Sequence, residues 1–452
     1  MKTRIILAGL LACVASPLFA QGGLPKMSLA DALEIARDRN PEYRRAVVDR
    51  NARGSSLRRG YGTFLPSITA SMNWNGNRQT TVTGTDDFGR PVNLPEPVTF
   101  LSSTASQNIQ ASVTLFDGLR NVKQLRAARY DLDAADEGVR GVGILVDAEV
   151  KTRFYQAIRR QRLIAVEQDL LASAQDRLSA NERLFRVGST DQVDVLGARV
   201  DVARQEQALE QARGEAGIAR LAVLQQLGIL DESLDFESVG SLAEPFDPSV
   251  LDAELLVRRS LEISPTVTQA DAQAAAASQR AGAQRGQWLP TVSVQGGYSR
   301  SLQERDYSAF GQLNPRNYGF GFGVNFSFPI FSGFQRLDDI VQADATARRA
   351  EETYRERTLQ VEQEVRAAFI RLRSAYDGLL IQRRATDLSR RQVELAREQF
   401  RIGSASMPFI SLQQINASAA IDERALVDAE YNFAIALVNL EARVGEPIVV
   451  PQ

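Results

Sequence analysis

Four stretches of this chain alternate apolar and polar residues with a period of two, which is typical of β-strands with one apolar face. The predicted strands cover residues 66–76, 107–116, 290–299 and 318–329. In the last of them the apolar positions are Tyr318, Phe320, Phe322, Val324, Phe326 and Phe328. The intervening residues are Gly, Asn and Ser. Each stretch is close to the ~9–11 residues that cross an outer membrane at a tilt. A half-buried sheet of a soluble protein alternates in the same way, so the period leaves both structures open.

Two polar segments connect these strands in pairs. Residues 77–106 and 300–317 are rich in Gly, Asn, Asp, Pro and Ser. That composition is typical of exposed turns and loops. We therefore expect two hairpins, each with a solvent-exposed loop.

Long helical segments follow each pair of strands. Apolar residues at heptad spacing predict helices over residues 119–187, 191–227, 333–402 and 407–444. At 1.5 Å per residue the longer ones reach ~100 Å, far beyond an ordinary globular helix. Gly138, Gly141 and Gly143 weaken the first long helix by roughly 1 kcal/mol each relative to Ala. They predict a kink or break in that helix only.

The chain contains the same unit twice. Pro41 and Pro66 recur 224 residues later as Pro265 and Pro290. A proline near the start of a helix is tolerated, so Pro41 and Pro265 each predict the start of a short helix before the strands. We divide the chain into repeat 1 (28–228), a linker (229–249) outside the helices, repeat 2 (250–445) and a short tail (446–452).

Composition argues against catalysis. Histidine is absent and Cys13 is the only cysteine, which excludes Ser-His-Asp and Cys-His catalysis and an intrachain disulfide. No glycine-rich phosphate loop follows a strand, and the carboxylates are spaced as on solvated helix faces. We therefore expect no enzyme, no cofactor and no metal site. The net charge of −2 does not indicate the excess of basic residues that is typical of nucleic-acid-binding proteins.

Residues 1–20 have the pattern of a secretory signal peptide. Lys2 and Arg4 precede a short apolar stretch, and Ala20 is a small residue suited to cleavage. The segment before Cys13 loosely resembles a lipoprotein cleavage box, so lipidation of Cys13 is an alternative. The predicted strands thus belong to an exported protein.

Four strands cannot close a barrel, and an open sheet edge is not viable in lipid. Strands in a membrane would therefore require several chains to share one barrel. The order and spacing of four short segments resembles the TolC family of outer-membrane efflux ducts over roughly residues 28–445. These segments are Asn40-Pro41-Glu42, Leu65-Pro66, residues 328–333 (FPIFSG) and residues 186–196 (RVGSTDQVDVL).

The resemblance implies a mainly α fold with β-strands in the membrane. The protomer would be a tandem repeat of long coiled-coil helices plus four amphipathic strands. Three protomers would form a trimeric α-barrel and a shared 12-stranded β-barrel. It also implies the outer-membrane channel of a tripartite efflux or type I secretion system, a passive conduit opened by a periplasmic adaptor and an inner-membrane pump. The protein would lie in outer-membrane lipid with its helical part in the periplasm. The two hairpin loops would then face outside.

The same resemblance places the periplasmic entrance at the helix tips, residues 186–196 and 401–412. Asp194 matches a family position that helps to keep the resting entrance closed, and Asp191 lies one turn earlier. Asp191 or Thr190 could instead be a helix N-cap. In repeat 2 an apolar segment replaces the family's acidic pair, so an apolar gate near Phe409 or Leu412 is possible.

The turns at Gly188-Ser189 and Gly403-Ser404 match the family's adaptor-contact surface. The glycines have a simpler explanation, since each permits a sharp reversal after a helix.

Two other kinds of protein remain to be weighed. A structural coiled-coil envelope protein without channel activity would explain the helices but not four amphipathic strands at matching points of two repeats. A general diffusion porin lacks helices of this length. The sequence does not separate drug efflux from protein secretion.

Overall fold

The computed structural model describes residues 26–85, 87–188, 190–229, 236–401 and 409–448. The chain divides into two compact units. The first combines residues 1–36, 150–244 and 388–431, and the second combines residues 37–149, 245–387 and 432–452. The predicted signal peptide (1–20) and Cys13 lie outside the described residues.

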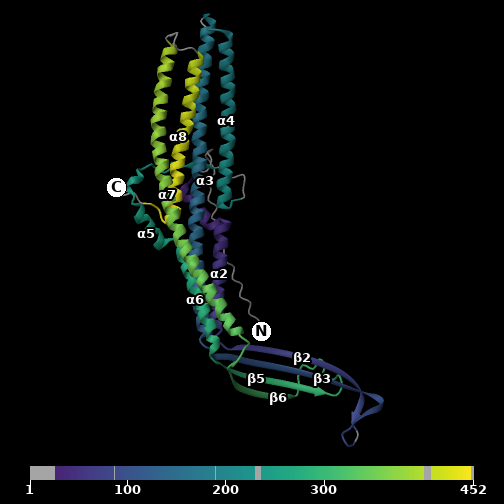
Figure 1. The fold of residues 1–452 in the computed structure, drawn as a ribbon. Helices are drawn as coiled ribbons and strands as arrows, with labels where there is room; N and C mark the ends of the chain where they lie inside the picture. The colour runs from purple at the N-terminus through teal and green to yellow at the C-terminus, as the bar shows by residue number, and fades with distance from the viewer. Residues whose placement is uncertain (1–25, 86, 189, 230–235, 402–408, 449–452) are drawn as a thin grey trace, which may run out of the picture. The chain divides into compact units, whose positions relative to one another are not determined.

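The helices of the two repeats correspond one to one (Figure 1). Repeat 1 contains α1 (Leu29–Arg39), α2 (Pro41–Gly62), α3 (Arg120–Arg186) and α4 (Gln192–Leu227). Repeat 2 contains α5 (Ala253–Ile263), α6 (Pro265–Arg285), α7 (Gln335–Arg401) and α8 (Phe409–Val444). The long helices α3 and α7 have 67 residues each, and α4 and α8 have 36 each. None of the described helices is long and apolar enough to cross a membrane.

The boundary between α1 and α2 follows from Asn40 and Pro41. The Asn40 side-chain oxygen accepts hydrogen bonds from the backbone N–H groups of Glu42 (2.8 Å) and Tyr43 (3.2 Å). Pro41 needs no such partner, because it has no N–H, and it occupies the first helical position. In repeat 2 Ser264 takes the same position before Pro265 but makes no side-chain capping bond. The proline alone therefore marks the start of α6.

The helix α3 is continuous through Gly138, Gly141 and Gly143, so the expected break is wrong. A side-chain carbon at Gly138 would lie 3.1 Å from Gln269, and one at Gly141 would lie 3.3 Å from Pro265. These glycines therefore allow close approach of α6. Packing against neighbouring helices outweighs their low helix propensity.

Four antiparallel strands form one sheet in the second unit, in the order β2-β3-β5-β6. They are β2 (Ser67–Thr85), β3 (Pro91–Phe116), β5 (Thr291–Glu304) and β6 (Asn317–Ser327). At one end every strand connects to a helix, and at the other end the strands join in two hairpins. Among the described residues β2 and β6 each pair with one strand only. Both edges of the sheet are open.

The expected loop over residues 77–106 is wrong, because the strands β2 and β3 continue through most of it. Arg78 pairs with Leu101, Thr80 with Thr99, and the pairing resumes at Thr83 after a register shift. This segment is rich in β-branched residues, which favour extended backbone. With 19 and 26 residues, β2 and β3 exceed the ~9–11 residues that a membrane crossing needs.

The two faces of the sheet differ in chemistry. On β6 the residues from Tyr318 to Phe326 at every second position are aromatic or Val and are largely exposed, with Phe322 82% exposed. Cross-strand neighbours on the same face include Tyr298 opposite Phe320 and Val294 opposite Val324. We call this the apolar face. The opposite face of β6 carries Gly, Asn and Ser.

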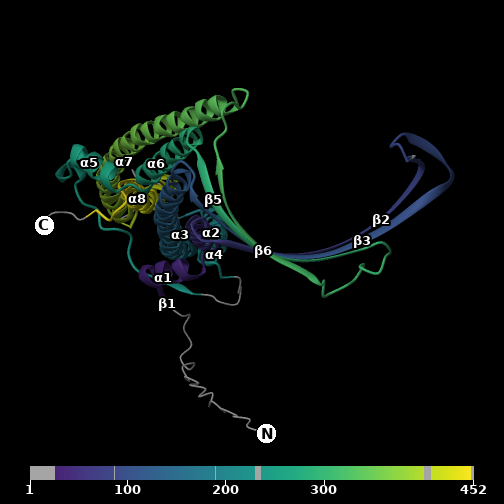
Figure 2. The same cartoon turned by 90° about the horizontal axis from the view of Figure 1, so that it is seen from below.

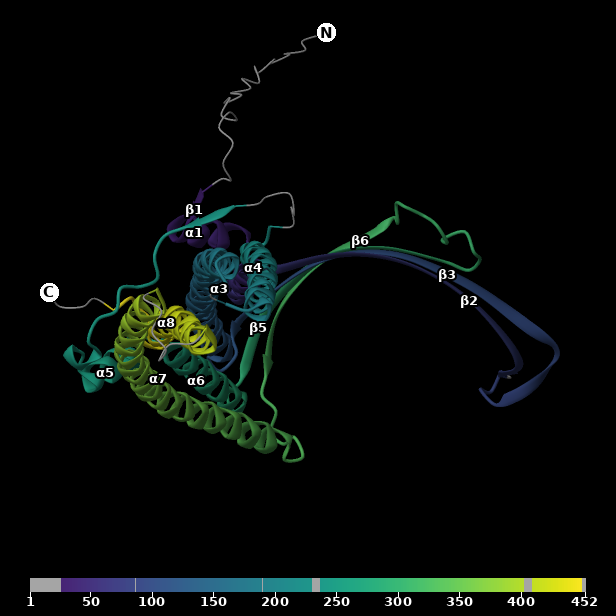
Figure 3. The same ribbon diagram turned by 90° about the horizontal axis from the view of Figure 1, so that it is seen from above.

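The sheet is curved, and the segment 305–316 between β5 and β6 lies on its convex side (Figures 2 and 3). This segment folds back on the outer part of the sheet. The Trp74 indole N–H donates to the Gln312 carbonyl oxygen at 3.1 Å, and the Gln107 amide donates to the Leu313 carbonyl oxygen at 2.5 Å. Trp74 and Gln107 both belong to the apolar face by their register. The convex side is therefore the apolar face.

The turn from strand to helix is the same in both repeats and has left-handed backbone. In repeat 1 Gly118 and Leu119 have φ of 72° and 64°, and in repeat 2 Gly333 and Phe334 have φ of 61° and 68°. The surroundings differ. A side-chain carbon on Gly118 would overlap the carbonyl oxygen of Gly286, whereas one on Gly333 would meet no atom within 4 Å.

The linker contains a strand that the sequence did not predict. Residues Glu237–Val239 (β4) pair in parallel with Lys26–Ser28 (β1), so that Lys26 lies opposite Glu237. Phe236 and Leu242 beside β4 are buried in the first unit. The linker thus packs on the helices through these two apolar side chains, and it closes a small sheet with the start of repeat 1.

Candidate functional site

The first helix tip joins α3 to α4 in the first unit. After Arg186 the chain reverses at Gly188, whose φ is 71° and whose N–H donates to the Phe185 carbonyl oxygen at 3.0 Å. Left-handed backbone of this kind ends many helices and favours glycine. Val187 is exposed beside this turn, and Val193 is exposed on the first turn of α4. The tip therefore presents apolar side chains as well as charge.

The two acidic candidates at this tip have different surroundings. Asp191 is the N-cap residue of α4, with extended backbone, but its exposed carboxylate makes no capping hydrogen bond. Asp194 lies in the first turn of α4 and accepts a hydrogen bond from the Thr190 hydroxyl at 2.5 Å. Thr190 thus orients Asp194 instead of capping the helix. Both carboxylates lie near the N-terminus of α4, where the helix dipole favours negative charge.

At the second tip only part of the prediction falls on described residues. Ser189, Gly403, Ser404 and the side chain of Phe409 lie outside the described part of the chain, and α8 begins at Phe409. Leu412 is 2% exposed and buried inside the first unit. Leu412 therefore contributes to the interior of the protomer, and the apolar gate near Phe409 or Leu412 stays a prediction.

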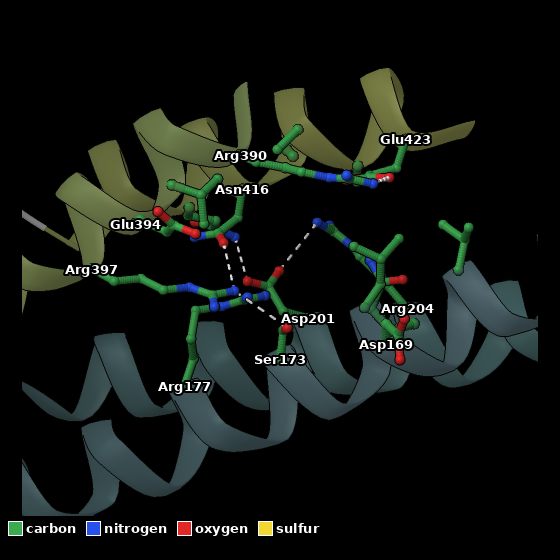
Figure 4. Close-up of a pocket in the computed structure, with 18 residues that line it drawn as sticks. Asp169, Ser173, Arg177, Asp201, Arg204, Arg390, Glu394, Arg397, Asn416 and Glu423 are labelled. Atoms are coloured by element: carbon green, nitrogen blue, oxygen red, sulfur yellow. Dashed lines mark hydrogen bonds and ion pairs between the residues drawn. The ribbon is translucent and has the colours of Figure 1, made fainter. Parts of the chain in front are cut away.

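Behind the tips a polar cavity of about 550 Å³ lies between the α3–α4 and α7–α8 hairpins (Figure 4). The Gln413 amide donates to an Asp201 carboxylate oxygen at 2.6 Å. The Arg397 guanidinium donates to the Ser173 hydroxyl at 3.3 Å and to the Asn416 side-chain oxygen at 3.5 Å. These polar contacts join the two repeats across the cavity.

Arg177 extends into this cavity from α3 (Figure 4). Burial lowers the pKa of its guanidinium, while the charge of Asp201 acts in the opposite direction. The cavity lining contains four arginines and four carboxylates, so its charge is balanced. Among the described residues no group of His, Cys, Asp and Glu could hold a metal ion.

A second set of contacts ties α8 to α3 further along the first unit. Arg424 makes a two-pronged pair with Glu167 at 2.6 and 2.8 Å, and the Glu167 side chain is only 7% exposed. Hydrogen bonding to Glu167 raises the pKa of Arg424 above its ordinary value. Arg159 pairs with Asp428 and Arg162 pairs with Glu430, both at 2.7 Å. Ion pairs of arginine therefore link repeat 1 to repeat 2.

Sequence reasoning missed these inter-repeat pairs. One available signal was the preference for arginine, since only four of the 53 basic residues are lysine. Arginine matches a carboxylate with two parallel N–H donors, which lysine cannot do. The partners could not be predicted, because the heptad pattern of one helix does not fix its register against another.

We expect Arg424→Gln to lower the free energy of unfolding by about 2 kcal/mol, because it leaves the buried Glu167 carboxylate without its cation. Breaking fully buried pairs costs roughly 3–5 kcal/mol, and the smaller value allows for the 36% exposure of the Arg424 side chain. Thermal unfolding followed by far-ultraviolet circular dichroism measures the change. Arg355→Gln is the control, since Arg355 is 75% exposed and its contact with Glu352 is 4.0 Å long. Equal loss in both variants would contradict the assignment.

Comparison with known proteins agrees with this architecture. The family model for outer membrane efflux proteins matches residues 32–229 and 256–446, one match for each repeat. The protein CyaE of Bordetella pertussis is 26% identical over 356 residues, which cover 78% of this chain and 70% of that protein. The cation efflux system protein CusC of Escherichia coli K12 is 20% identical over 377 residues, 83% of this chain and 76% of that protein.

Solved structures show the same fold. A membrane protein from Pseudomonas aeruginosa superposes with a TM-score of 0.74 at 20% identity, covering 92% of this chain and 93% of that one. The outer membrane protein VceC from Vibrio cholerae has a TM-score of 0.72 at 15% identity, covering 93% and 96%. The family model accounts for most of both repeats, and the resemblance first noted in the short motifs is confirmed. The chain belongs to the outer membrane efflux protein family.

Proposed function

We propose that the protein is the outer-membrane channel of a tripartite efflux or type I secretion system, a passive conduit from the periplasm to the exterior. The observation that supports this most directly is the four-stranded sheet with two open edges and one exposed aromatic face. An open edge cannot remain in lipid, because unpaired backbone groups cost several kcal/mol each there. Three copies joined edge to edge would remove every edge.

The helical part supports the same assembly. The four long helices carry apolar stripes, and many of their apolar residues stay exposed in the single protomer, among them Ile218, Leu221, Ile370 and Leu395. Neighbouring protomers would cover them, as in other helical packings driven by burial of apolar surface. A closed ring of helices is the assembly that gives every helix a neighbour on both sides.

Partners of this channel follow from the same proposal. The relatives include a protein named for a cation efflux system, so a pump and an adaptor are part of the proposed machinery. The helix tips, with Gly188 at the reversal and exposed Val187 and Val193, are the surface that we assign to the adaptor. Ser189, Gly403 and Ser404 stay part of this surface as predictions from the sequence.

The assembly is tested by the native mass of protein extracted from isolated outer membranes, together with conductance in planar lipid bilayers. A trimer that conducts supports the proposal. A monomer in the soluble periplasmic fraction would favour the alternative, a structural coiled-coil protein of the envelope.

The acidic tip of α4 is proposed as part of the closed entrance. The Asp191 carboxylate is exposed and uncapped, and one oxygen of Asp194 bonds to Thr190, so both can still bind a neighbouring protomer. We expect the double variant Asp191→Asn and Asp194→Asn to raise the resting conductance of the trimer, because neutral hydrogen bonds would hold the entrance closed less strongly than charge-assisted ones. Single-channel recording measures it.

Glu206→Gln is the matched control for that experiment. It removes one carboxylate charge per protomer, against two in the double variant, from an exposed position on α4 away from the tip. Its conductance should equal that of the unsubstituted channel. If the double variant also behaves like the unsubstituted channel, the two carboxylates have no part in closing the entrance.

A further inference from the structure

An arginine lies on the apolar face beside the outer end of the aromatic residues of β6. In β5 the residues at every second position from Val292 to Arg300 share one face, so Arg300 is on the same side as Tyr298. It lies opposite Gln107 of β3 and Tyr318 of β6. Tyr318 is the last aromatic residue of the stripe on β6 towards the hairpin. Arg300 therefore stands beside the last aromatic residue of β6 on this face.

The distance along the strand places this boundary near the membrane surface. From Phe326 to Tyr318 the strand advances ~27 Å at ~3.4 Å per residue. An outer-membrane barrel has an apolar band ~25 Å tall with aromatic residues at both borders. Helices connect to one end of the strands and hairpins to the other, and Arg300 lies towards the hairpin end. With the helices in the periplasm, Arg300 therefore lies at the border of the apolar band that faces the exterior. Arginine there needs a polar partner.

Within the described residues the Arg300 side chain has no hydrogen bond or ion pair, and its Nε atom is buried without a partner. Buried polar atoms are nearly always satisfied, so this guanidinium still has hydrogen-bonding capacity for a group from outside the protomer. A phosphate fits best, since guanidinium binds phosphate oxygens in a two-pronged geometry.

The segment 305–316 adds cations and apolar side chains at the same border. It is held on the apolar face through Trp74 and Gln107. Arg305 and Arg316 stand at its two ends, exposed and without ion pairs among the described residues. Phe310 and Leu313 are exposed between them. An amphipathic segment with arginines beside apolar residues is typical of a membrane interface.

We propose that Arg300 and the segment 305–316 form a binding site for a phosphorylated glycolipid of the outer leaflet. The lipid phosphate would bind the Arg300 guanidinium, Arg305 and Arg316 would add attraction for the anionic headgroup, and Phe310 and Leu313 would contact the acyl chains. The local charge favours an anion, with three arginines against Glu304 and Asp306. This inference rests on the proposed function, because it requires the apolar face to lie in the outer membrane.

The test uses the full trimer, purified and freed of lipid, with native mass spectrometry as the readout. Bisphosphorylated lipid A is added in parallel with its dephosphorylated form and with inorganic phosphate. We expect bisphosphorylated lipid A to bind at least ten-fold more tightly than the dephosphorylated form, and inorganic phosphate not to compete at equal concentration. Equal binding of both lipids would overturn the proposal, and so would full competition by inorganic phosphate, which would indicate a simple anion site.

Substitutions of Arg300 test whether this residue binds the lipid phosphate. Arg300→Gln should weaken binding of bisphosphorylated lipid A at least ten-fold, and Arg300→Lys should weaken it less, because the charge stays but the two-pronged geometry is lost. Arg90→Gln removes the same charge from the tip of the β2–β3 hairpin and should bind as the unsubstituted protein does. If Arg300→Gln and Arg90→Gln bind equally well, Arg300 is not the ligand-binding residue.

Two outcomes separate this inference from the proposed function. If the unsubstituted trimer conducts in planar bilayers and does not distinguish the two lipids, the glycolipid site is wrong and the channel stands. If no trimer or conductance is found, the proposed function fails and the inference fails with it. Should Arg300→Gln not assemble, the comparison of the two lipids on the unsubstituted trimer still decides.

Discussion

Gly118→Ala should lower the free energy of unfolding by about 3–5 kcal/mol. Part of this loss, roughly 1–2 kcal/mol, comes from placing Ala in left-handed backbone at φ 72°. The remainder comes from overlap of the new methyl group with the Gly286 carbonyl oxygen and from its approach to Leu289 Cβ at 3.0 Å. Backbone atoms cannot rotate away, so the turn between β3 and α3 must shift. The urea midpoint of tryptophan fluorescence reports the change, because both tryptophans, Trp74 and Trp288, belong to the second unit.

The second repeat provides the matched control. Gly333→Ala places the same residue at the equivalent turn, with φ of 61°, but its methyl group meets no atom within 4 Å. We expect a loss of about 1–2 kcal/mol from backbone conformation alone. The difference between the two variants isolates the contact between Gly118 and Gly286. Equal losses would show that this close approach has no energetic importance.

Phe322→Arg should abolish the outer-membrane trimer. Phe322 lies midway along the aromatic stripe of β6 and is 82% exposed. A lipid-facing arginine at the bilayer midplane costs roughly 2–4 kcal/mol, and a trimer would carry three of them. Membrane fractionation followed by native mass measurement should find little trimer in the outer membrane.

Asn325→Arg is the control for position and charge. Asn325 is on the other face of the same strand, opposite Ser293, where a charged side chain would meet water. Its trimer should assemble at the usual level. If Asn325→Arg is lost from the membrane as completely as Phe322→Arg, the apolar face is not the lipid face.

The heptad spacing of apolar residues predicted the helices and their buried positions, because a helix that packs along its length needs apolar residues at that spacing on the packed side. Leu209, Ala216 and Val223 at heptad spacing are all buried on α4. Leu412, named from the sequence as a gate candidate, is buried in the protomer in the same way. The interior of a helix pair and the lining of a narrow pore both favour apolar residues, so composition alone could not separate them.

The outer part of the first hairpin was missed because it has no apolar contrast. Thr80 pairs with Thr99 through their hydroxyl groups, and polar residues occupy both faces there. When both faces of a strand are exposed to solvent, its sequence does not alternate in hydrophobicity and resembles that of a loop. Of the candidate site, the sequence predicted the position of Asp191 and Asp194 at the helix tip, and their role stays a prediction. The orienting bond from Thr190 depends on a side-chain rotamer that the sequence does not fix.

The parallel pairing of β1 with β4 has a consequence for the order in which the chain folds. Lys26 comes early in the chain, and its partner Glu237 follows only after the whole of repeat 1. Since a chain is synthesised from its N-terminus, this small sheet cannot form until all four helices and both strands of repeat 1 have emerged. Contacts between such distant residues raise the contact order and slow folding. This sheet therefore forms late in the folding of this region, and residues 26–28 have no strand partner until residues 237–239 have been synthesised.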